Sequence, residues 1–411
     1  MVPLVFVRSA SPRRPALLRS ALIVATCLLG LSLPCRAAAN PLDGRSIWIW
    51  YVSPSAGGSA AQIAAQARSA GVTNVIVKSG DGTGYWSQFS SRLVRSLHAG
   101  GLHVCAWQYV YGTYPAAEAA ISADAVRAGA DCLIIDAEAE YEGRYASAQV
   151  YVDDLRAAIG SRYPVGLASF PYVDYHPAFP YSVFLGPGGA QFNLPQMYWS
   201  DIGVSPETVF HHTYTYNRIY RRAIYPLGQL YNVGPTEVEL FRGLTVRYRA
   251  RGISWWDWAW AGAAGLWGPL SGPYLAAGSV ASLGFPSLGV GSAGDEVVWL
   301  QQHLARAIPG QRITGTFAAQ TEGNLRAFQR RRHLAATGRT DPATWYALFR
   351  LAPVRVSWAA AAGAADLGGS RGARGRGGGP AARGSAPASA ALPARGYEIP
   401  RTDSGPFAPV P

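Results

Sequence analysis

The chain has 411 residues, more than one ordinary domain needs, which predicts two domains with additional segments. The formal net charge is +12, and removing the five arginines of the first 39 residues leaves a modest excess of +7. The sequence has no basic patch interleaved with aromatic side chains, so we expect no nucleic-acid partner.

The first 39 residues have the pattern of a secretory signal peptide. Arginines precede an apolar run from Ala21 to Leu33, and small residues follow at 37–39. We therefore predict a signal peptide at 1–39 and a secreted protein. No other run reaches the roughly 18 apolar residues of a membrane helix, so no membrane contact is expected after cleavage.

Residues 44–268 repeat one unit, in which an apolar strand is followed by a polar or aromatic loop and an amphipathic helix. The predicted strands are Ser46–Val52, Asn74–Ser79, His103–Tyr109, Cys132–Asp136, Val165–Phe170, Phe192–Tyr198, Ile224–Leu230 and Gly252–Trp256. Eight such repeats predict an α/β fold, a (β/α)8 TIM barrel, in which active sites lie on the loops after the strands.

The fourth strand runs into acids at every second position, Asp136, Glu138 and Glu140. These side chains share a face if the extended backbone continues that far. Neighbouring carboxylates repel each other, so one of them holds a proton, which suits a general acid. We predict these three residues as catalytic; a solvated acidic strand end is the alternative interpretation.

The other strand ends carry aromatic rings beside amides and acids. A pyranose has an apolar face and a polar rim, so this mixture suits a sugar, while an aromatic barrel core is the alternative. The predicted substrate-binding residues are Trp50, Lys78, Asp81, Trp107, Gln108, Tyr109, Tyr172, Gln196, Tyr198, Trp199, Gln229, Tyr231, Trp256 and Asp257.

Two of the residue types in this region are rare in the chain. Lys78 is the only lysine. Its ammonium would hold one carboxylate ionised while a neighbour stays protonated, or it is an ordinary loop lysine. Cys105 and Cys132 fall in neighbouring predicted strands, where a disulfide and two buried free thiols both fit.

The sequence contains no metal or cofactor motif. Its histidines lack a spacing such as H-E-x-x-H and a nearby cysteine pair. It has no G-x-S-x-G and no phosphate-binding glycine loop with lysine. We expect no metal and no cofactor, and we exclude serine hydrolases and nucleotide binding.

The step Asp136-Ala137-Glu138 ending the fourth strand, with Gln196-Met197-Tyr198 ending the sixth and tryptophan ending the eighth, resembles barrel glycosidases of the chitinase and muramidase families. Those families act on glycans with N-acetylated sugars, including chitin and peptidoglycan. The resemblance implies that Glu138 is the general acid, that Asp136 orients or stabilises the acetamido group, and that Tyr198 hydrogen-bonds to it. The acetamido oxygen is then the implied nucleophile.

The sequence departs from the chitinase pattern at two places. Leu133, Ile134 and Ile135 stand where the chitinase signature has further aspartates, and Glu140 and Glu142 add acids. Glu140 is therefore the second candidate for the general acid.

A linker at 269–287 precedes a small all-α domain predicted at 288–352. The segments GDEVVWLQ, GTF with a following threonine, FQ and TWYAL resemble, in order and spacing, the three-helix peptidoglycan-binding domain of wall hydrolases. That resemblance implies a module that docks the chain on peptidoglycan, and hence a secreted, cell-wall-associated protein. Thr314 and Thr337, each before a glycine, depart from the family pattern.

The remaining sequence, 353–411, is rich in Gly, Ala, Arg and Pro and predicts a disordered tail. The predicted protein is a monomeric wall glycosidase of the muramidase or glucosaminidase type, with peptidoglycan or a related glycan as its partner. A non-catalytic barrel that binds wall glycan is the alternative.

Overall fold

A computed structural model describes residues 40–358 of the chain. The predicted signal peptide and residues 359–411 of the predicted tail lie outside this range. Within residues 40–358, no helix combines the length and the apolar character needed to cross a membrane.

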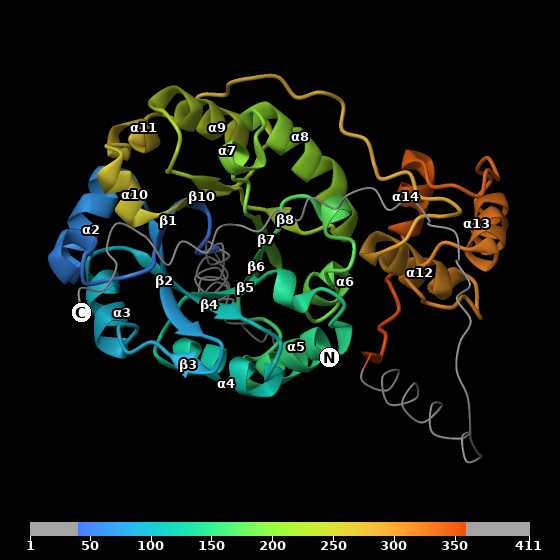
Figure 1. Cartoon of the computed structure of the whole chain (residues 1–411), viewed down its shortest axis with the longest axis horizontal. Helices are drawn as coiled ribbons and strands as arrows, with labels where there is room; N and C mark the ends of the chain where they lie inside the picture. The colour runs from blue at the N-terminus through green and yellow to red at the C-terminus, as the bar shows by residue number, and fades with distance from the viewer. Residues whose placement is uncertain (1–39, 359–411) are drawn as a thin grey trace, which may run out of the picture. The chain divides into compact units, whose positions relative to one another are not determined.

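Eight parallel strand positions form a closed barrel (Figure 1). The strands are β1 (Gly44–Ile49), β2 (Asn74–Asp81), β4 (His103–Val110), β5 (Cys132–Ala137), β6 (Val165–Ser169), β7 (Phe192–Pro195), β8 (Ala223–Ile224), β9 (Leu227–Gln229) and β10 (Gly252–Trp256). β10 pairs with β1, and β7 pairs with β8 and, through a bridge at Gln196 and Leu227, contacts β9. The predicted (β/α)8 barrel is therefore confirmed.

The seventh predicted strand, Ile224–Leu230, is present as two short pieces, β8 and β9. Pro226 stands between them and has no N–H to donate to the ladder, which explains the interruption. The backbone stays aligned across it, because Tyr225 N bonds to Asn193 O at 2.8 Å and Met197 N to Leu227 O at 2.8 Å. β8 and β9 thus occupy one strand position.

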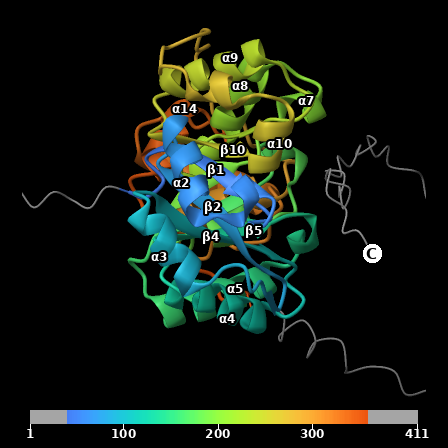
Figure 2. The same ribbon diagram turned by 90° about the vertical axis from the view of Figure 1, so that its left-hand side faces the viewer.

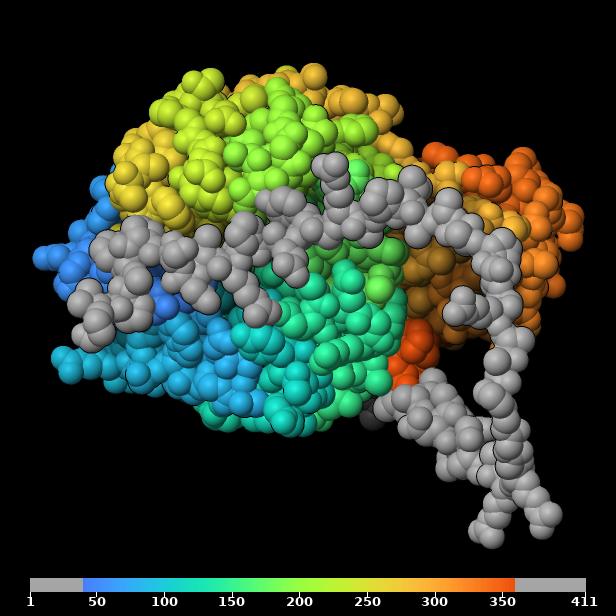
Figure 3. All heavy atoms as spheres, in the orientation of Figure 1, coloured from blue at the N-terminus to red at the C-terminus, as the bar shows by residue number. Residues whose placement is uncertain are grey.

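Helices cover the outside of the strands, as the view in Figure 2 shows. They are α2 (Ala60–Ser69), α3 (Ser91–Ala99), α4 (Pro115–Arg127), α5 (Tyr145–Ile159), α6 (Tyr181–Phe184), α7 (Trp199–Ile202), α8 (Pro206–Asn217), α9 (Pro235–Arg247), α10 (Trp258–Ala263) and α11 (Trp267–Ser271). Ser59, Ser90 and Ser205 cap α2, α3 and α8 through their hydroxyl oxygens. In the space-filling view, the visible coloured segments of the barrel pack side by side (Figure 3).

The barrel has two cores, as the alternation of strand side chains requires. Residues such as Ile47, Val75 and Ile135 pack between strands and helices. Trp48, Ile76, Cys105, Trp107, Cys132, Ile134, Ala168 and Leu194 belong to a second cluster, contributed by alternate strand positions. Gly166 leaves room in this second core, since a Cβ there would lie 2.5 Å from Leu194. Near the strand ends, side chains at the same alternate positions therefore also point into the barrel.

A disulfide joins Cys105 and Cys132 inside this second core. The two residues are direct partners in the ladder between β4 and β5, with their Cα atoms 4.5 Å apart. Of the two states that fit the sequence, the structure shows the bonded one.

The predicted three-helix unit is also confirmed and consists of α12 (Asp295–Ala307), α13 (Ala319–Arg331) and α14 (Pro342–Leu348). Leu300, Leu325, Phe328, Trp345 and Leu348 are buried in it. Asp341 caps α14 by accepting from Thr344 N at 2.7 Å, and Pro342 occupies the first helical position. The exact limits of the domains remain a prediction.

Candidate active site

Two of the three predicted catalytic acids lie together at the end of β5. Asp136 is buried within the strand, and half-buried Glu138 follows it in nearly extended conformation. The strand ends at Ala137, and a 3-10 turn, η2 (Ala139–Tyr141), then carries Glu140. The extension therefore stops before Glu140, which does not continue the face that Asp136 begins.

The amide of Gln196 joins Asp136 and Glu138. Its Nε2 donates to Asp136 Oδ1 at 3.1 Å and to Glu138 Oε1 at 2.8 Å. Gln196 is held by the closing strands, because its own backbone N bonds to Ser169 O at 2.9 Å. One amide donor thus keeps two carboxyl groups close to each other.

Electrostatics favour a proton on this pair. Burial raises the pKa of Asp136 well above its ordinary value, and the charge of Glu138 raises it further. The ammonium of Lys78 and the Gln196 hydrogen bond lower the pKa of Asp136, whereas Asp81 raises it. The Asp136 carboxyl group, which shares the Gln196 amide with Glu138, therefore retains its proton to higher pH than a free aspartate would.

Glu140 has a different partner. The hydroxyl of Tyr109 donates to Glu140 Oε2 at 2.8 Å. Burial, followed by the charge of Glu138 and the bond to Glu140, raises the pKa of Tyr109, so its hydroxyl stays protonated. Tyr109 thereby fixes the η2 turn beside the strand end.

Lys78 lies in β2, three residues before its end, within a group of indole rings. Its side chain is 3% exposed, and its Nζ lies 2.7 Å from Asp81 Oδ2. The Nζ also lies 4.7, 4.5 and 4.7 Å from the ring centroids of Trp50, Trp86 and Trp107. Lys78 therefore lies in a strand and not in a loop. Its effect on the protonation of the carboxylates stays a prediction.

A bulge brings Lys78 and Asp81 together. The ladder to β4 shifts register between Lys78 and Gly80, with Ser79 as the extra residue. Residues three apart face opposite sides of a regular strand, and the added residue turns Asp81 toward the lysine. The Ser79 hydroxyl bonds to Trp107 O at 3.0 Å, which holds the bulge in place.

Three more predicted residues lie in the inner cluster or beside it. Trp256 contacts Trp50 and Trp107, each at 5.6 Å between ring centroids. Tyr198 is 5% exposed, with the Tyr231 ring at 6.0 Å. Burial, followed by the neighbouring Tyr231 and Asp136, raises the pKa of Tyr198, so it acts as a neutral hydroxyl.

Asp257 follows Trp256 and begins α10. Its Oδ1 accepts from Trp260 N at 3.2 Å, so it is a helix cap. Burial raises the pKa of Asp257 to about 6 against the opposing effect of backbone hydrogen bonds.

Four predicted binding residues make contacts away from the acid pair: Gln108, Trp199, Gln229 and Tyr172. Gln108 is enclosed beside α4, donating to Gly82 O at 2.7 Å and accepting from Ser122 Oγ at 2.6 Å. Because Trp107 and Tyr109 face inward, the residue between them faces outward. We therefore leave Gln108 out of the proposed site.

Contacts within the fold also hold Trp199, Gln229 and Tyr172. Trp199 donates to Glu237 at 2.9 Å, and Gln229 accepts from Ser200 N at 2.9 Å while donating to Tyr231 O at 3.0 Å. Tyr172 stacks on His212 at 3.8 Å. These three side chains are also left out of the proposed site.

Four side chains near Lys78 were missed from the sequence: Tyr51, Trp86, Gln88 and Tyr111. Trp86 and Gln88 follow a short hairpin strand, β3 (Gly84–Tyr85), that pairs with β2. The Gly82 and Gly84 pair flanking Thr83 was the available turn signal. Tyr51 follows the end of β1 by two residues, and Tyr111 follows the end of β4 by one.

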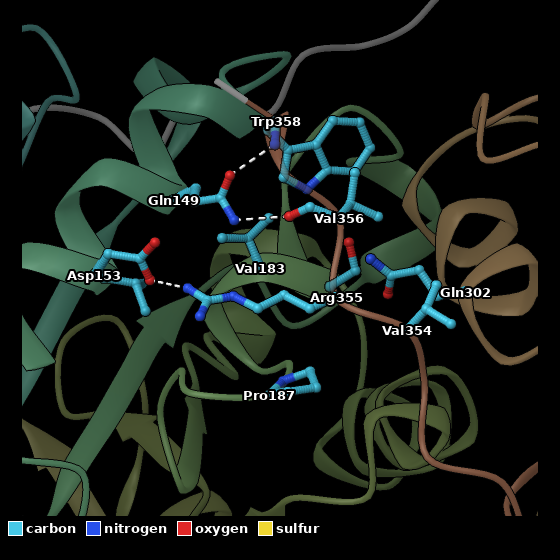
Figure 4. A pocket seen from close by; sticks show the side chains of 11 residues that line it. Gln149, Asp153, Val183, Pro187, Gln302, Val354, Arg355, Val356 and Trp358 are labelled. Carbon is cyan, nitrogen blue, oxygen red and sulfur yellow. Dashed lines mark hydrogen bonds and ion pairs between the residues drawn. The ribbon is translucent and has the colours of Figure 1, made fainter. Parts of the chain in front are cut away.

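A hollow between α5 and residues 354–358 is too small to hold a sugar. Residues 354–358 cross α5, where Gln149 donates to Val356 O at 2.8 Å and accepts from Trp358 N at 2.7 Å (Figure 4). Arg355 pairs with Asp153 beside them. The hollow under this segment has a volume of about 20 Å³, room for about one water molecule. In residues 40–358, no three His, Cys, Asp or Glu side chains are grouped so as to hold a metal ion.

The helical unit can be assigned to a family. Residues 293–348 match the family described as "Putative peptidoglycan binding domain". The resemblance noted in the sequence is therefore confirmed for this peptidoglycan-binding domain. No curated protein matches the chain.

Solved structures with similar shape include several enzymes. An endo-β-1,4-mannanase from Thermotoga petrophila has 9% identity and a TM-score of 0.41, covering 53% of this chain and 68% of its own. A chitinase from Ipomoea carnea has 11% identity and a TM-score of 0.40, covering 56% and 98%. The Cpl-1 endolysin, complexed with a peptidoglycan analogue, has 15% identity and a TM-score of 0.29, covering 41% and 48%. At these values the similarities carry no argument about activity.

Proposed function

We propose that the protein is an exported glycoside hydrolase that cleaves N-acetylated glycan strands of peptidoglycan, of the muramidase or glucosaminidase type. The observation that carries the proposal is the pair Asp136 and Glu138, joined by Gln196 at the strand ends of a barrel. The peptidoglycan-binding domain in the same chain supports the choice of polymer. By itself, that domain supports only a wall-glycan hydrolase or binder.

In the proposed mechanism Glu138 is the general acid. The pair retains one proton, and Glu138 is the member with greater exposure, so it delivers the proton to the leaving glycosidic oxygen. As that C–O bond breaks, the acetamido oxygen of the substrate forms a bond to the same carbon. Water then attacks this carbon, gives a proton to the Glu138 carboxylate and releases the acetamido group.

Asp136 and Tyr198 position the acetamido group in this scheme. Asp136 is buried beside Glu138, where a carboxyl group hydrogen-bonds to the acetamido N–H and stabilises the charge that develops there. Tyr198 is kept neutral by burial, so its hydroxyl donates to the same group. Two carboxyl groups from one strand do not straddle the bond, which is why the substrate supplies the nucleophile.

The test compares Glu138→Gln with Glu140→Gln by release of reducing ends from purified peptidoglycan. We expect Glu138→Gln to lower turnover at least about 100-fold, the usual contribution of a general acid, and Glu140→Gln to lower it much less. Full activity in both variants would reject the assignment. A wild-type protein that binds peptidoglycan without releasing reducing ends would instead favour a non-catalytic wall-glycan binder.

A further inference from the structure

A row of side chains leads away from the acids across the ends of β5, β4 and β2. Tyr109 donates to Glu140, and its ring lies 5.0 Å from that of Tyr111. Tyr111 in turn donates to Asp81 Oδ1 at 2.8 Å, and Asp81 pairs with Lys78. Each member contacts the next, so the row is continuous from η2 to β2.

The row continues through indole rings to the loop after β1. The Lys78 ammonium lies over Trp50 and Trp86. The Tyr51 ring stacks on Trp50 at 5.9 Å with an interplanar angle of 9°, and lies 5.4 Å from Trp86. Tyr51 is 48% exposed, so the row ends in an aromatic ring open to solvent.

The backbone on both sides of Tyr51 is fixed. Gln88 Nε2 donates to Trp50 O at 2.7 Å, and Gln88 Oε1 accepts from Val52 N at 3.0 Å. The Ser55 hydroxyl donates to Tyr51 O at 2.7 Å. An exposed ring on an immobilised backbone has already lost part of the freedom that binding would otherwise cost.

We propose that Tyr51 and Trp86 form a remote sugar subsite, and that the glycan runs from the acids over β4, β2 and β1. This inference rests on the proposed function, because it concerns the same N-acetylated glycan. A pyranose ring offers an apolar face to Tyr51, while its hydroxyl rim meets polar groups such as Asp81 along the row. The subsite thus lengthens the stretch of polymer that the protein holds.

The opposite direction would take the glycan over the loop after β6. The exposed tyrosine there is Tyr175, 67% exposed, whose ring contacts are Tyr172 and His212. Tyr172 is buried against His212 of α8, so this group packs on α8 and is not part of the row. Tyr175 is therefore a matched control of the same residue type across the strand ends.

The experiment measures binding, so it is independent of turnover. The full protein carrying Glu138→Gln is titrated with N-acetylglucosamine oligomers of two and six sugars, and the dissociation constants are compared after Tyr51→Ala, Tyr51→Phe and Tyr175→Ala. We expect Tyr51→Ala to weaken hexamer binding about tenfold and leave dimer binding unchanged, as a lost aromatic contact of about 1.4 kcal/mol would. Tyr51→Phe and Tyr175→Ala should bind as the parent does.

Unchanged hexamer binding by Tyr51→Ala, or weakening by Tyr175→Ala instead, would overturn the subsite. Circular dichroism spectra that match the parent show that each variant is folded. A wild-type protein that binds the hexamer but cleaves no glycan would reject the proposed hydrolase activity, and the Tyr51 comparison would still decide the path of the glycan.

Discussion

At the residue scale, the charge of Lys78 opposes burial and the charge of Glu138 in their effect on the protonation of Asp136. The ammonium lowers the pKa of Asp136, so a neutral side chain at position 78 lets that pKa rise. Activity that needs one proton on the pair would then persist to higher pH. We expect the pH–activity profile of Lys78→Met to move toward alkaline pH, measured by reducing-end release across a buffer series.

Lys78→Arg serves as the control, since it retains the charge and should leave the position of the profile unchanged even if turnover falls. A profile that stays in place in Lys78→Met would remove Lys78 from the mechanism. Met fills a similar volume among the three indole rings, so the variant is expected to fold.

Strand alternation explains which residues could be chosen from the sequence. The period of two is enough to place Asp136 on one face with Glu138, and Trp48 on one face with Trp50. The same period excludes Gln108 once Trp107 and Tyr109 are assigned to the inside. The meeting of Lys78 with Asp81 depends on a bulge at Ser79, and a bulge has no reliable signature in one sequence.

At the element scale, strand positions were more predictable than strand ends. Apolar runs bounded by turn residues located every barrel strand, because a buried parallel strand must be apolar on both faces. The turn at η2 was not predicted, since its residues, Ala139–Tyr141, lack glycine and proline. The role of Glu140 was therefore beyond what spacing could decide.

The disulfide between β4 and β5 contributes to stability at this scale. Cys105 and Cys132 are 27 positions apart, and closing a loop of that length stabilises the folded chain by about 3.5 kcal/mol. We expect Cys105→Ala together with Cys132→Ala to lower the free energy of unfolding by about that amount in urea titrations. Both cysteines are fully buried, so dithiothreitol should reduce the native protein far more slowly than the unfolded chain.

The paired alanine change leaves a void as well, so Cys105→Ala with Cys132→Val offers a control of larger volume. Equal stability of the reduced and oxidised wild type would contradict a stabilising bond.

At the scale of the whole molecule, α12 is bonded to the barrel through Asp295. The buried carboxylate accepts from Ser182 N at 2.8 Å, from Ser182 Oγ at 2.6 Å and from the Tyr220 hydroxyl at 2.7 Å. The segment GDEVVWLQ resembles the peptidoglycan-binding family, and that resemblance could not predict the bonds of Asp295 to Ser182 and Tyr220. The partners are more than 70 residues away in the chain.

Asp295→Ala leaves these donors buried without an acceptor, and we expect a loss of about 3 kcal/mol in the free energy of unfolding. Asp341→Ala is the matched control, because Asp341 caps α14 and should cost only about 1 kcal/mol. Urea titration measures both. Equal losses in the two variants would show that Asp295 acts only as a helix start.

Asp295 also makes stability depend on pH. Burial raises the pKa of Asp295 to about 6, above its ordinary value of 3.8. Between these values the folded state binds more protons than the unfolded state. The stabilisation that Asp295 contributes is therefore full below about pH 4 and decreases as the pH rises through 6. Relative to Asp295→Asn, the wild-type protein should lose stability over this interval, and a constant difference between the two would contradict the assignment.

The position of the disulfide also restricts the register of β4 and β5. A slip of one residue between β4 and β5 would turn one cysteine outward and carry Tyr109 and Asp136 out of alignment. Sulfur atoms on opposite faces cannot bond, so the disulfide is incompatible with the slipped register in the folded chain. The bond thus holds Tyr109 opposite Asp136 and keeps the strand ends that bear the acids aligned.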